Sequence, residues 1–508
     1  MKKLMSLALV LCLLLSLLGA YAESDVAQAA APAEAAPAQA VPDEAADNDL
    51  VQTHHTVQIA GQTIDYTATT GTLAVELEGS TSDMFFTAYT MDGVEDLNER
   101  PVTFVFNGGP GSSSEWMHLG MLGPRRVDVD ESGRPKELPV KLVDNPYSLL
   151  DMTDLVFIDP VGTGYSRATG ETDPNVFYTY ASDVMSVSKL IRLYVTRNGR
   201  WGSPKYLAGE SYGTVRAIGV TNYLADAFSM SLNGVILVSS INDFYTSSEF
   251  TGSDLSYVLT LPTYAALGQY HGMLAEPYQS MALEDLMDEV RSFAGQGYQE
   301  ALYKGSRLTG EEKNAVAEQI AGYTGLDAAF VLKHNLRIDV EDFCKQLLSD
   351  QKLVIGRIDG RYTGPVTGGS FGSSSADPSL GVLGGAFGMA VNEYIAGELN
   401  YHSDKLYETL SISVSESWRY GLDNQVLCQE GDIYNAISQN AFLKIWVLCG
   451  YYDLATPFHS AEWVYDHVFL NPENEGRITF TYYPSGHMIY MHEPSLAKFR
   501  QEAEAWYK

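Results

Sequence analysis

The sequence has 508 residues, of which 45% are hydrophobic and 19% are charged. This composition supports a large buried core and excludes a wholly disordered or fibrous chain. The length corresponds to about three average domains, or to one large domain with an insertion. Lys and Arg number 32 against 64 Asp and Glu, so the net charge is −32. A general basic field that attracts nucleic acid is excluded, and no nucleic-acid partner is expected.

The first residues have the features of a secretory signal peptide. Two lysines precede an apolar run over residues 4–18, and Ala20 and Ala22 supply small residues at positions −3 and −1 of a cleavage site. The run is shorter than the roughly 18 to 20 apolar residues of a spanning helix. Residues 1–22 therefore predict a signal peptide, and we expect a secreted, periplasmic or cell-envelope protein with no integral membrane segment after signal removal. The sequence has no Asn-x-Ser/Thr acceptor, which is more typical of a bacterial secreted protein.

Composition changes again after the signal. Residues 23–50 consist mainly of Ala, Pro, Gln and acidic residues and predict a disordered linker. From residue 51 to about 89, β-branched and aromatic residues alternate with polar ones, which indicates antiparallel strands. Six short apolar runs follow, each ended by a turn with Gly or Pro, and this pattern is typical of strands buried on both faces: 102–106, 155–158, 206–208, 235–238, 445–449 and 478–483.

The apolar runs alternate with helical patterns such as 180–195 and 212–225. An α/β fold is expected, with a mostly parallel central sheet flanked by helices. Between residues 244 and 434 helical patterns dominate, interrupted by a Gly/Ser-rich stretch over 364–388. We interpret residues 244–434 as a mainly helical cap inserted over the carboxyl edge of the sheet. The core is then expected in two parts, 51–243 and 435–508.

A Gly-x-Ser-x-Gly motif lies at Gly209-Glu210-Ser211-Tyr212-Gly213, after an apolar run and before a helical pattern. Such a motif arises by chance in many chains of this length. Its place between a strand and a helix indicates a sharp turn that lifts the Ser211 hydroxyl clear of the sheet. We therefore predict that Ser211 is a nucleophile.

A serine nucleophile on such a turn needs an acid and a histidine downstream, in that order. Asp453 follows the run 445–449, and His487 follows the run 478–483. We predict that His487 takes the proton of Ser211 and later delivers it to the leaving group, while Asp453 orients the imidazole. The alternative is an aspartate that caps a loop and an ordinary turn histidine.

The run 102–106 is followed by the glycine-rich segment 107–114, with the sequence NGGPGSSS. Glycines let backbone amides approach a ligand closely. We predict that the amides of Gly109 and Tyr212 form an oxyanion hole. The alternative is a flexible Gly/Ser loop without a role.

No cofactor and no metal ion are expected. The chain has no Cys-x-x-Cys pair and no His-Glu-x-x-His, and its ten histidines are scattered. Three cysteines lie outside the signal, so at most one disulfide can form.

Together these segments resemble the serine carboxypeptidases of the α/β-hydrolase superfamily. The glycine-rich segment is similar to the family's NGGPGCSS, the nucleophile motif to GESYA or GESYG, and residues 486–488 to GHM. Two other stretches agree as well, NPYS at 145–148 and DPVGTGYS at 159–166. The resemblance implies that the side chain of Asn107, the amide of Gly108 and Glu210 bind the free α-carboxylate of a peptide.

A carboxylate can share a proton with Glu210 only when Glu210 is protonated, so this binding is expected to favour acidic pH. The chain departs from the family at two positions. Met121 stands where the family has a second Glu, and Ser112 replaces the motif cysteine. Glu115 is a candidate substitute for the missing carboxyl.

The sequence thus predicts a secreted bacterial serine carboxypeptidase that removes C-terminal residues from peptides through an acyl-enzyme on Ser211. Two alternatives stay open: an esterase or acyltransferase with the same triad, and a non-catalytic surface-binding protein. Peptide substrates are the expected partners, and the sequence carries no signal for an oligomeric state.

Overall fold

The computed structural model describes residues 50–247, 252–366, 377–421 and 425–508. These residues belong to one compact unit that begins at Asp47. The predicted signal peptide, and the predicted linker up to residue 49, lie outside the described residues.

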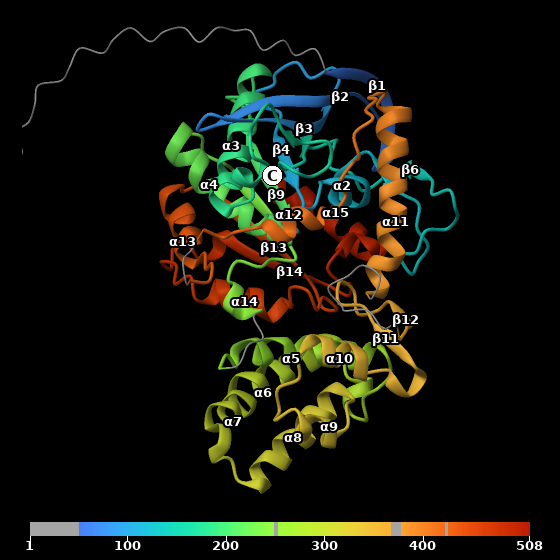
Figure 1. Ribbon diagram of the computed structural model, residues 1–508, viewed down its shortest axis with the longest axis vertical. Coiled ribbons are helices and arrows are strands. Elements are labelled where there is room, and N and C mark those ends of the chain that lie inside the picture. The colour runs from blue at the N-terminus through green and yellow to red at the C-terminus, as the bar shows by residue number, and fades with distance from the viewer. Residues whose placement is uncertain (1–49, 248–251, 367–376, 422–424) are drawn as a thin grey trace, which may run out of the picture. The chain divides into compact units, whose positions relative to one another are not determined.

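A sheet of ten strands is the framework of the α/β part of the chain (Figure 1). Its strand order is β1-β2-β3-β7-β4-β9-β10-β13-β14, and β8 pairs with β3. Its strands are β1 (Val51–Ile59), β2 (Gln62–Leu77), β3 (Ser80–Met91), β4 (Val102–Phe106), β7 (Asp154–Ile158), β8 (Arg167–Ala168), β9 (Lys205–Glu210), β10 (Gly234–Val238), β13 (Lys444–Gly450) and β14 (Ile478–Tyr483). Two small antiparallel pairs lie apart from it: β5 (Arg125–Val127) with β6 (Leu142–Asp144), and β11 (Leu353–Ile355) with β12 (Thr363–Pro365).

Six neighbouring strands of the sheet run parallel to one another: β7, β4, β9, β10, β13 and β14. Strands β1, β2 and β3 add an antiparallel edge. The prediction of a mostly parallel α/β sheet is confirmed. Successive side chains of a strand point to opposite faces of the sheet. In β10, Val235 and Leu237 belong to one hydrophobic cluster, and Ile236 and Val238 belong to another. The core strands are apolar at nearly every position because both faces are covered.

Helices cover the two faces of the sheet (Figure 1). Side chains of α3 and α4 join the first cluster, and side chains of α11 and α15 join the second. The helices are α2 (Glu115–Met117), α3 (Tyr180–Arg197), α4 (Tyr212–Phe228), α5 (Leu255–Tyr270), α6 (Leu283–Phe293), α7 (Gln299–Lys304), α8 (Gly310–Thr324), α9 (Ala328–Lys333), α10 (Val340–Gln346), α11 (Pro378–Glu393), α12 (Ile412–Ser417), α13 (Glu430–Gln439), α14 (Phe458–Asp466) and α15 (Glu493–Tyr507).

Helices α5 to α13 and the pair β11–β12 lie between β10 and β13 in the chain. Helix α5 packs against α6 and α8, and also against α14, which follows β13. The role of residues 244–434 as a cap stays a prediction. Within the described residues, no helix combines the length and the apolar character that crossing a membrane requires.

Candidate active site

Ser211 lies on a tight turn between β9 and α4. Its backbone has φ 60° and ψ −130°, a conformation that costs free energy in a residue with a side chain. The turn needs glycine on both sides. A Cβ atom on Gly209 would lie 2.2 Å from the carbonyl oxygen of Gly213, and a Cβ atom on Gly213 would lie 2.9 Å from that of Phe106. The glycines of the motif thus let the chain turn sharply at Ser211, at the amino end of α4.

Asp453 and His487 come from the ends of two neighbouring parallel strands. Asp453 follows β13, His487 follows β14, and these strands pair in register. Nδ1 of His487 lies 2.7 Å from Oδ2 of Asp453. Oδ1 of Asp453 accepts hydrogen bonds from the amides of Ala455 (2.8 Å) and Thr456 (3.0 Å), so the carboxylate is fixed from both sides.

Two hydrogen bonds anchor the backbone of His487. The backbone amide of His487 donates to the carbonyl oxygen of Ile358 at 2.8 Å, and the backbone carbonyl oxygen of His487 accepts from the hydroxyl of Ser239 at 2.6 Å. Burial lowers the pKa of His487, but the charges of Asp453 and Glu210 outweigh burial, and the pKa is raised from its ordinary value. The arrangement therefore stabilises the imidazolium form that a general base acquires during catalysis.

The predicted site residues converge on one cavity of about 340 Å³. Ser211 and His487 both line it, and Asp453 lies fully buried on the far side of the imidazole. The other predicted residues that line this cavity are Asn107, Gly108, Gly109, Glu210 and Tyr212. The catalytic and binding roles of all these residues stay predictions.

The glycine-rich loop after β4 packs directly against the turn that carries Ser211. A Cβ atom on Gly108 would lie 2.5 Å from the amide nitrogen of Tyr212. Gly109 has φ 99°, which favours glycine. The loop therefore approaches closely enough for its backbone and that of Tyr212 to border the same part of the cavity, at the electropositive end of α4.

Glu210 is buried and receives two hydrogen bonds on one oxygen. Nδ2 of Asn107 donates to Oε2 of Glu210 at 2.6 Å, and the hydroxyl of Tyr490 donates to the same atom at 2.9 Å. Burial raises the pKa of Glu210 to about 7, although His487, Tyr490 and Asn107 each act to lower it. This carboxyl can therefore carry a proton near neutral pH.

Tyr490 was not among the residues that the sequence singled out. It lies three positions after His487, and its ring packs against Gly120, where a Cβ atom would lie 2.4 Å from the ring. Glu115, the candidate substitute for the missing carboxyl, does not share a proton with Glu210. Both oxygens of Glu115 are buried and lack a hydrogen-bond partner among the described residues. The hydroxyl of Tyr490 is the group that meets Glu210 instead.

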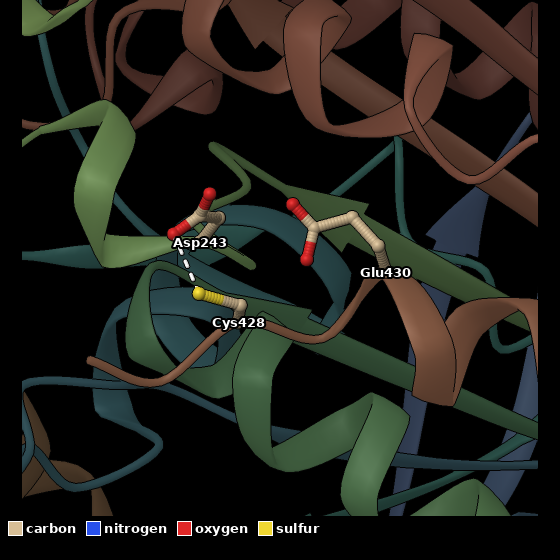
Figure 2. A group of neighbouring side chains, drawn as sticks. All are labelled: Asp243, Cys428 and Glu430. Carbon is tan, nitrogen blue, oxygen red and sulfur yellow. Dashed lines mark hydrogen bonds between the residues drawn. The ribbon is translucent and has the colours of Figure 1, made fainter. Parts of the chain in front are cut away.

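Figure 2 shows another group of reactive side chains, Asp243, Cys428 and Glu430, whose potential ligand atoms lie within 4.8 Å of one another. A thiol binds metal ions as the thiolate. Here Sγ of Cys428 donates to Oδ1 of Asp243 at 3.2 Å, and burial, followed by this hydrogen bond, raises the pKa of Cys428 to about 12. Oδ1 of Asp243 also accepts from the amide of Tyr245 at 2.8 Å. These contacts explain the group structurally, and the expectation that no metal is needed stays a prediction.

A family model described as serine carboxypeptidase matches residues 59–258 of the chain. Serine carboxypeptidase-like 36 of Arabidopsis thaliana is 30% identical over 171 residues, which cover 33% of this chain and 32% of that protein. The pheromone-processing carboxypeptidase KEX1 of Saccharomyces cerevisiae is 35% identical over 116 residues, which cover 22% of this chain and 15% of that protein. The matched stretches thus span about a third or less of these relatives' length.

The crystal structure of a prohormone-processing carboxypeptidase from Saccharomyces cerevisiae, Kex1Δp, superimposes with a TM-score of 0.55. The match covers 87% of this chain and 91% of that one at 16% sequence identity. It shows that the two proteins share a fold, and it extends far beyond the stretch that sequence comparison matches.

Proposed function

With the resemblance to the serine carboxypeptidase family confirmed over residues 59–258, we propose that this α/β-hydrolase is a serine carboxypeptidase that removes C-terminal residues from peptides. The observation that carries the proposal is the 2.7 Å contact between Asp453 and His487, at the cavity that Ser211 also lines. The strained turn at Ser211 supports a nucleophile at this position.

The proposed reaction begins when Ser211 attacks the carbonyl carbon of the last peptide bond. Nε2 of His487 takes the hydroxyl proton as the bond between Oγ and carbon forms, while the N–H at Nδ1 keeps its proton and donates a hydrogen bond to Asp453. The carbonyl oxygen becomes an oxyanion that the amides of Gly109 and Tyr212 stabilise. His487 then delivers its proton to the leaving amine, and the C–N bond breaks to give an acyl-enzyme.

Water completes the proposed cycle. His487 takes a proton from water as the water oxygen attacks the acyl carbon, and it returns that proton to Oγ of Ser211 as the ester bond breaks. The products are a free amino acid and a peptide that is one residue shorter. No cofactor takes part in any of these steps.

Recognition of the C-terminal carboxylate is proposed for Asn107, the amide of Gly108 and Glu210. Glu210 is suited to this role because its raised pKa of about 7 allows it to share a proton with a second carboxylate. Met121 cannot assist as an acid. The recognition site therefore relies on one carboxyl, supported by the hydroxyl of Tyr490.

Export is proposed from the sequence of residues 1–22. Mass spectrometry of the protein isolated from its native compartment tests this point. The expected amino terminus is Glu23, and a mature protein that retains the first residues contradicts export by a cleaved signal.

A fluorophosphonate probe tests the nucleophile directly. We expect covalent labelling of wild-type protein at Ser211, identified by peptide mapping, and no labelling of the Ser211→Ala variant. Substrates then separate the remaining possibilities. Hydrolysis of an acylated dipeptide supports the peptidase, hydrolysis of an aryl ester alone supports the esterase alternative, and absence of labelling supports a non-catalytic binding protein.

A further inference from the structure

Arg357 is a cation that lines the active-site cavity, and it has no carboxylate partner among the described residues. It lies just after β11 and lines the same cavity as Ser211 and His487. Its guanidinium makes a long contact, 3.5 Å from Nη2 to the carbonyl oxygen of Ala455. Among the described residues, no carboxylate oxygen lies within ion-pair distance of it, although Arg361, four residues further on, pairs with Asp359 at 2.6 Å.

The two acids that line the cavity together with Arg357, Asp377 and Glu210, already accept hydrogen bonds from other groups. Asp377 accepts hydrogen bonds from the backbone amides of Arg357 (2.9 Å) and Ile358 (3.2 Å) on Oδ2 and from that of Ser379 (2.8 Å) on Oδ1. It thereby caps the amino end of α11. Glu210 accepts from Asn107 and Tyr490 on one oxygen. The positive charge of Arg357 is therefore available to a ligand.

The guanidinium is also close to the reacting groups. Burial, Asp453 and Glu210 have the largest effects on the pKa of His487. The positive charge of Arg357 acts on it as well and lowers it. The apolar side chains of Ile358 and Leu380 line the cavity as well. A substrate side chain that combines methylene groups with a terminal anion fits this surface.

We infer that Arg357 determines specificity by binding the side-chain carboxylate of a Glu or Asp residue next to the scissile bond. The inference rests on the proposed function and names its preferred substrates, peptides with an acidic residue at or beside the C-terminus. A guanidinium can bind a carboxylate through two parallel N–H···O bonds, which a neutral side-chain amide cannot match in charge. Discrimination is therefore expected between Glu and its neutral isostere Gln.

The test compares four acylated dipeptides, with Glu or Gln at the last position and with Glu or Gln at the position before it. In wild-type protein we expect kcat/KM to favour Glu over Gln by about tenfold at one of the two positions. Arg357→Gln should abolish that preference while the Gln peptide is still hydrolysed. Arg357→Lys should keep part of it, because the charge stays but the planar fork is lost.

Lys352→Gln is the matched control, since it removes one exposed positive charge nearby in sequence and outside the residues that line the cavity. This variant should leave the ratio of kcat/KM for the Glu peptide to kcat/KM for the Gln peptide unchanged. A wild-type ratio near one, or a ratio that Arg357→Gln leaves unchanged, overturns the inference. The α-carboxylate is the other source of the same chemistry. If Arg357→Gln instead lowers the ratio of kcat/KM for the free peptide to kcat/KM for the amidated peptide, Arg357 binds the C-terminus and the inference is wrong.

A binding assay separates this inference from the proposed function. Acylated Glu and acylated Gln are tested as competitors of fluorophosphonate labelling, which requires no peptide hydrolysis. Preferential protection by acylated Glu that Arg357→Gln removes supports the inference even if peptides are not substrates. Equal protection by both compounds, together with hydrolysis of the Gln peptide, overturns the inference and leaves the proposed function standing.

Discussion

Nδ1 of His487 and Oδ2 of Asp453 lie 2.7 Å apart at the ends of two neighbouring strands, and both side chains are buried. The hydroxyl of Thr456 lies 2.7 Å from the same carboxylate oxygen, and Oδ1 is occupied by two backbone amides. Both carboxylate oxygens of Asp453 thus have hydrogen-bond partners within the protein. The imidazole is left with Nε2 available to the cavity.

Asp453→Asn should therefore reverse the hydrogen-bonding order at this pair. The side-chain oxygen stays with the amides of Ala455 and Thr456, so the amide NH₂ of Asn faces His487 and forces its proton onto Nε2. Nε2 then cannot accept the proton of Ser211, and we expect kcat to fall by roughly 10³- to 10⁴-fold with KM little changed. Steady-state kinetics on an acylated dipeptide measure this. A loss smaller than tenfold, in a variant with unaltered thermal stability, shows that Asp453 does not orient the base.

The proton on Glu210 should govern binding of peptides with a free C-terminus. Its pKa is raised to about 7, so below pH 7 the carboxyl is protonated and can donate to a substrate carboxylate, and above pH 7 the two anions repel. KM should therefore rise as the pH rises through about 7. Glu210→Gln should flatten this rise because Gln donates at every pH. A KM that stays constant from pH 5 to 8 in wild type contradicts the assignment.

Tyr490→Phe should shift the same transition in a defined direction. The hydroxyl of Tyr490 donates to Oε2 of Glu210 and so stabilises the ionised form. Without that donor the pKa of Glu210 rises further, and the increase in KM should move to higher pH. A matched substitution at an exposed tyrosine, Tyr303→Phe, should leave the profile unchanged. A shift to lower pH in the Tyr490 variant would mean that its hydroxyl does not act as a donor to Glu210.

Glu115 should weaken the fold at neutral pH. It is fully buried, its oxygens lack hydrogen-bond partners in the described chain, and burial, followed by the charge of Asp159, raises its pKa well above the ordinary value. When the pKa of an acid is raised in the folded state, the protein becomes less stable as the pH rises above the pKa that the same acid has in the unfolded chain. Glu115→Gln should therefore raise the free energy of unfolding at pH 8 relative to wild type, by about 1–3 kcal/mol.

Thermal unfolding at pH 4 and at pH 8 checks this expectation. The gain from Glu115→Gln should be larger at pH 8 than at pH 4, because at the lower pH the carboxyl is protonated in the folded state and mostly protonated in the unfolded chain. An equal change at both pH values indicates a packing effect and not the release of a buried charge.

Much of the site could be predicted because each predicted residue lies beside a recognisable local pattern. The strand at Val102–Phe106 was predicted with the bounds that the structure has, and apolar runs also precede Ser211, Asp453 and His487. The carboxyl ends of parallel strands meet at one edge of a sheet. Residues that directly follow such strands are therefore brought together by the fold itself.

Tyr490 and Arg357 could not be found in this way. Tyr490 follows no strand and meets Glu210 through a turn whose path depends on tertiary packing. Arg357 comes from the segment between β10 and β13, where the pattern gives no register relative to the sheet. In the same segment, the stretch 364–388 was predicted as an interruption of the helices because it is rich in Gly and Ser. Helix α11 nevertheless begins inside it, at Pro378, because Asp377 caps its amino end and proline suits a first helical position.

The most direct measurement of the central claim is mass spectrometry of the products from one peptide in two forms, with a free and with an amidated C-terminus. Wild-type protein should shorten the free form by single residues from the C-terminus and should leave the amidated form nearly intact. The Ser211→Ala variant should cleave neither form. Cleavage of both forms at equal rates, cleavage at internal bonds, or unchanged cleavage by Ser211→Ala would contradict a serine carboxypeptidase at this site.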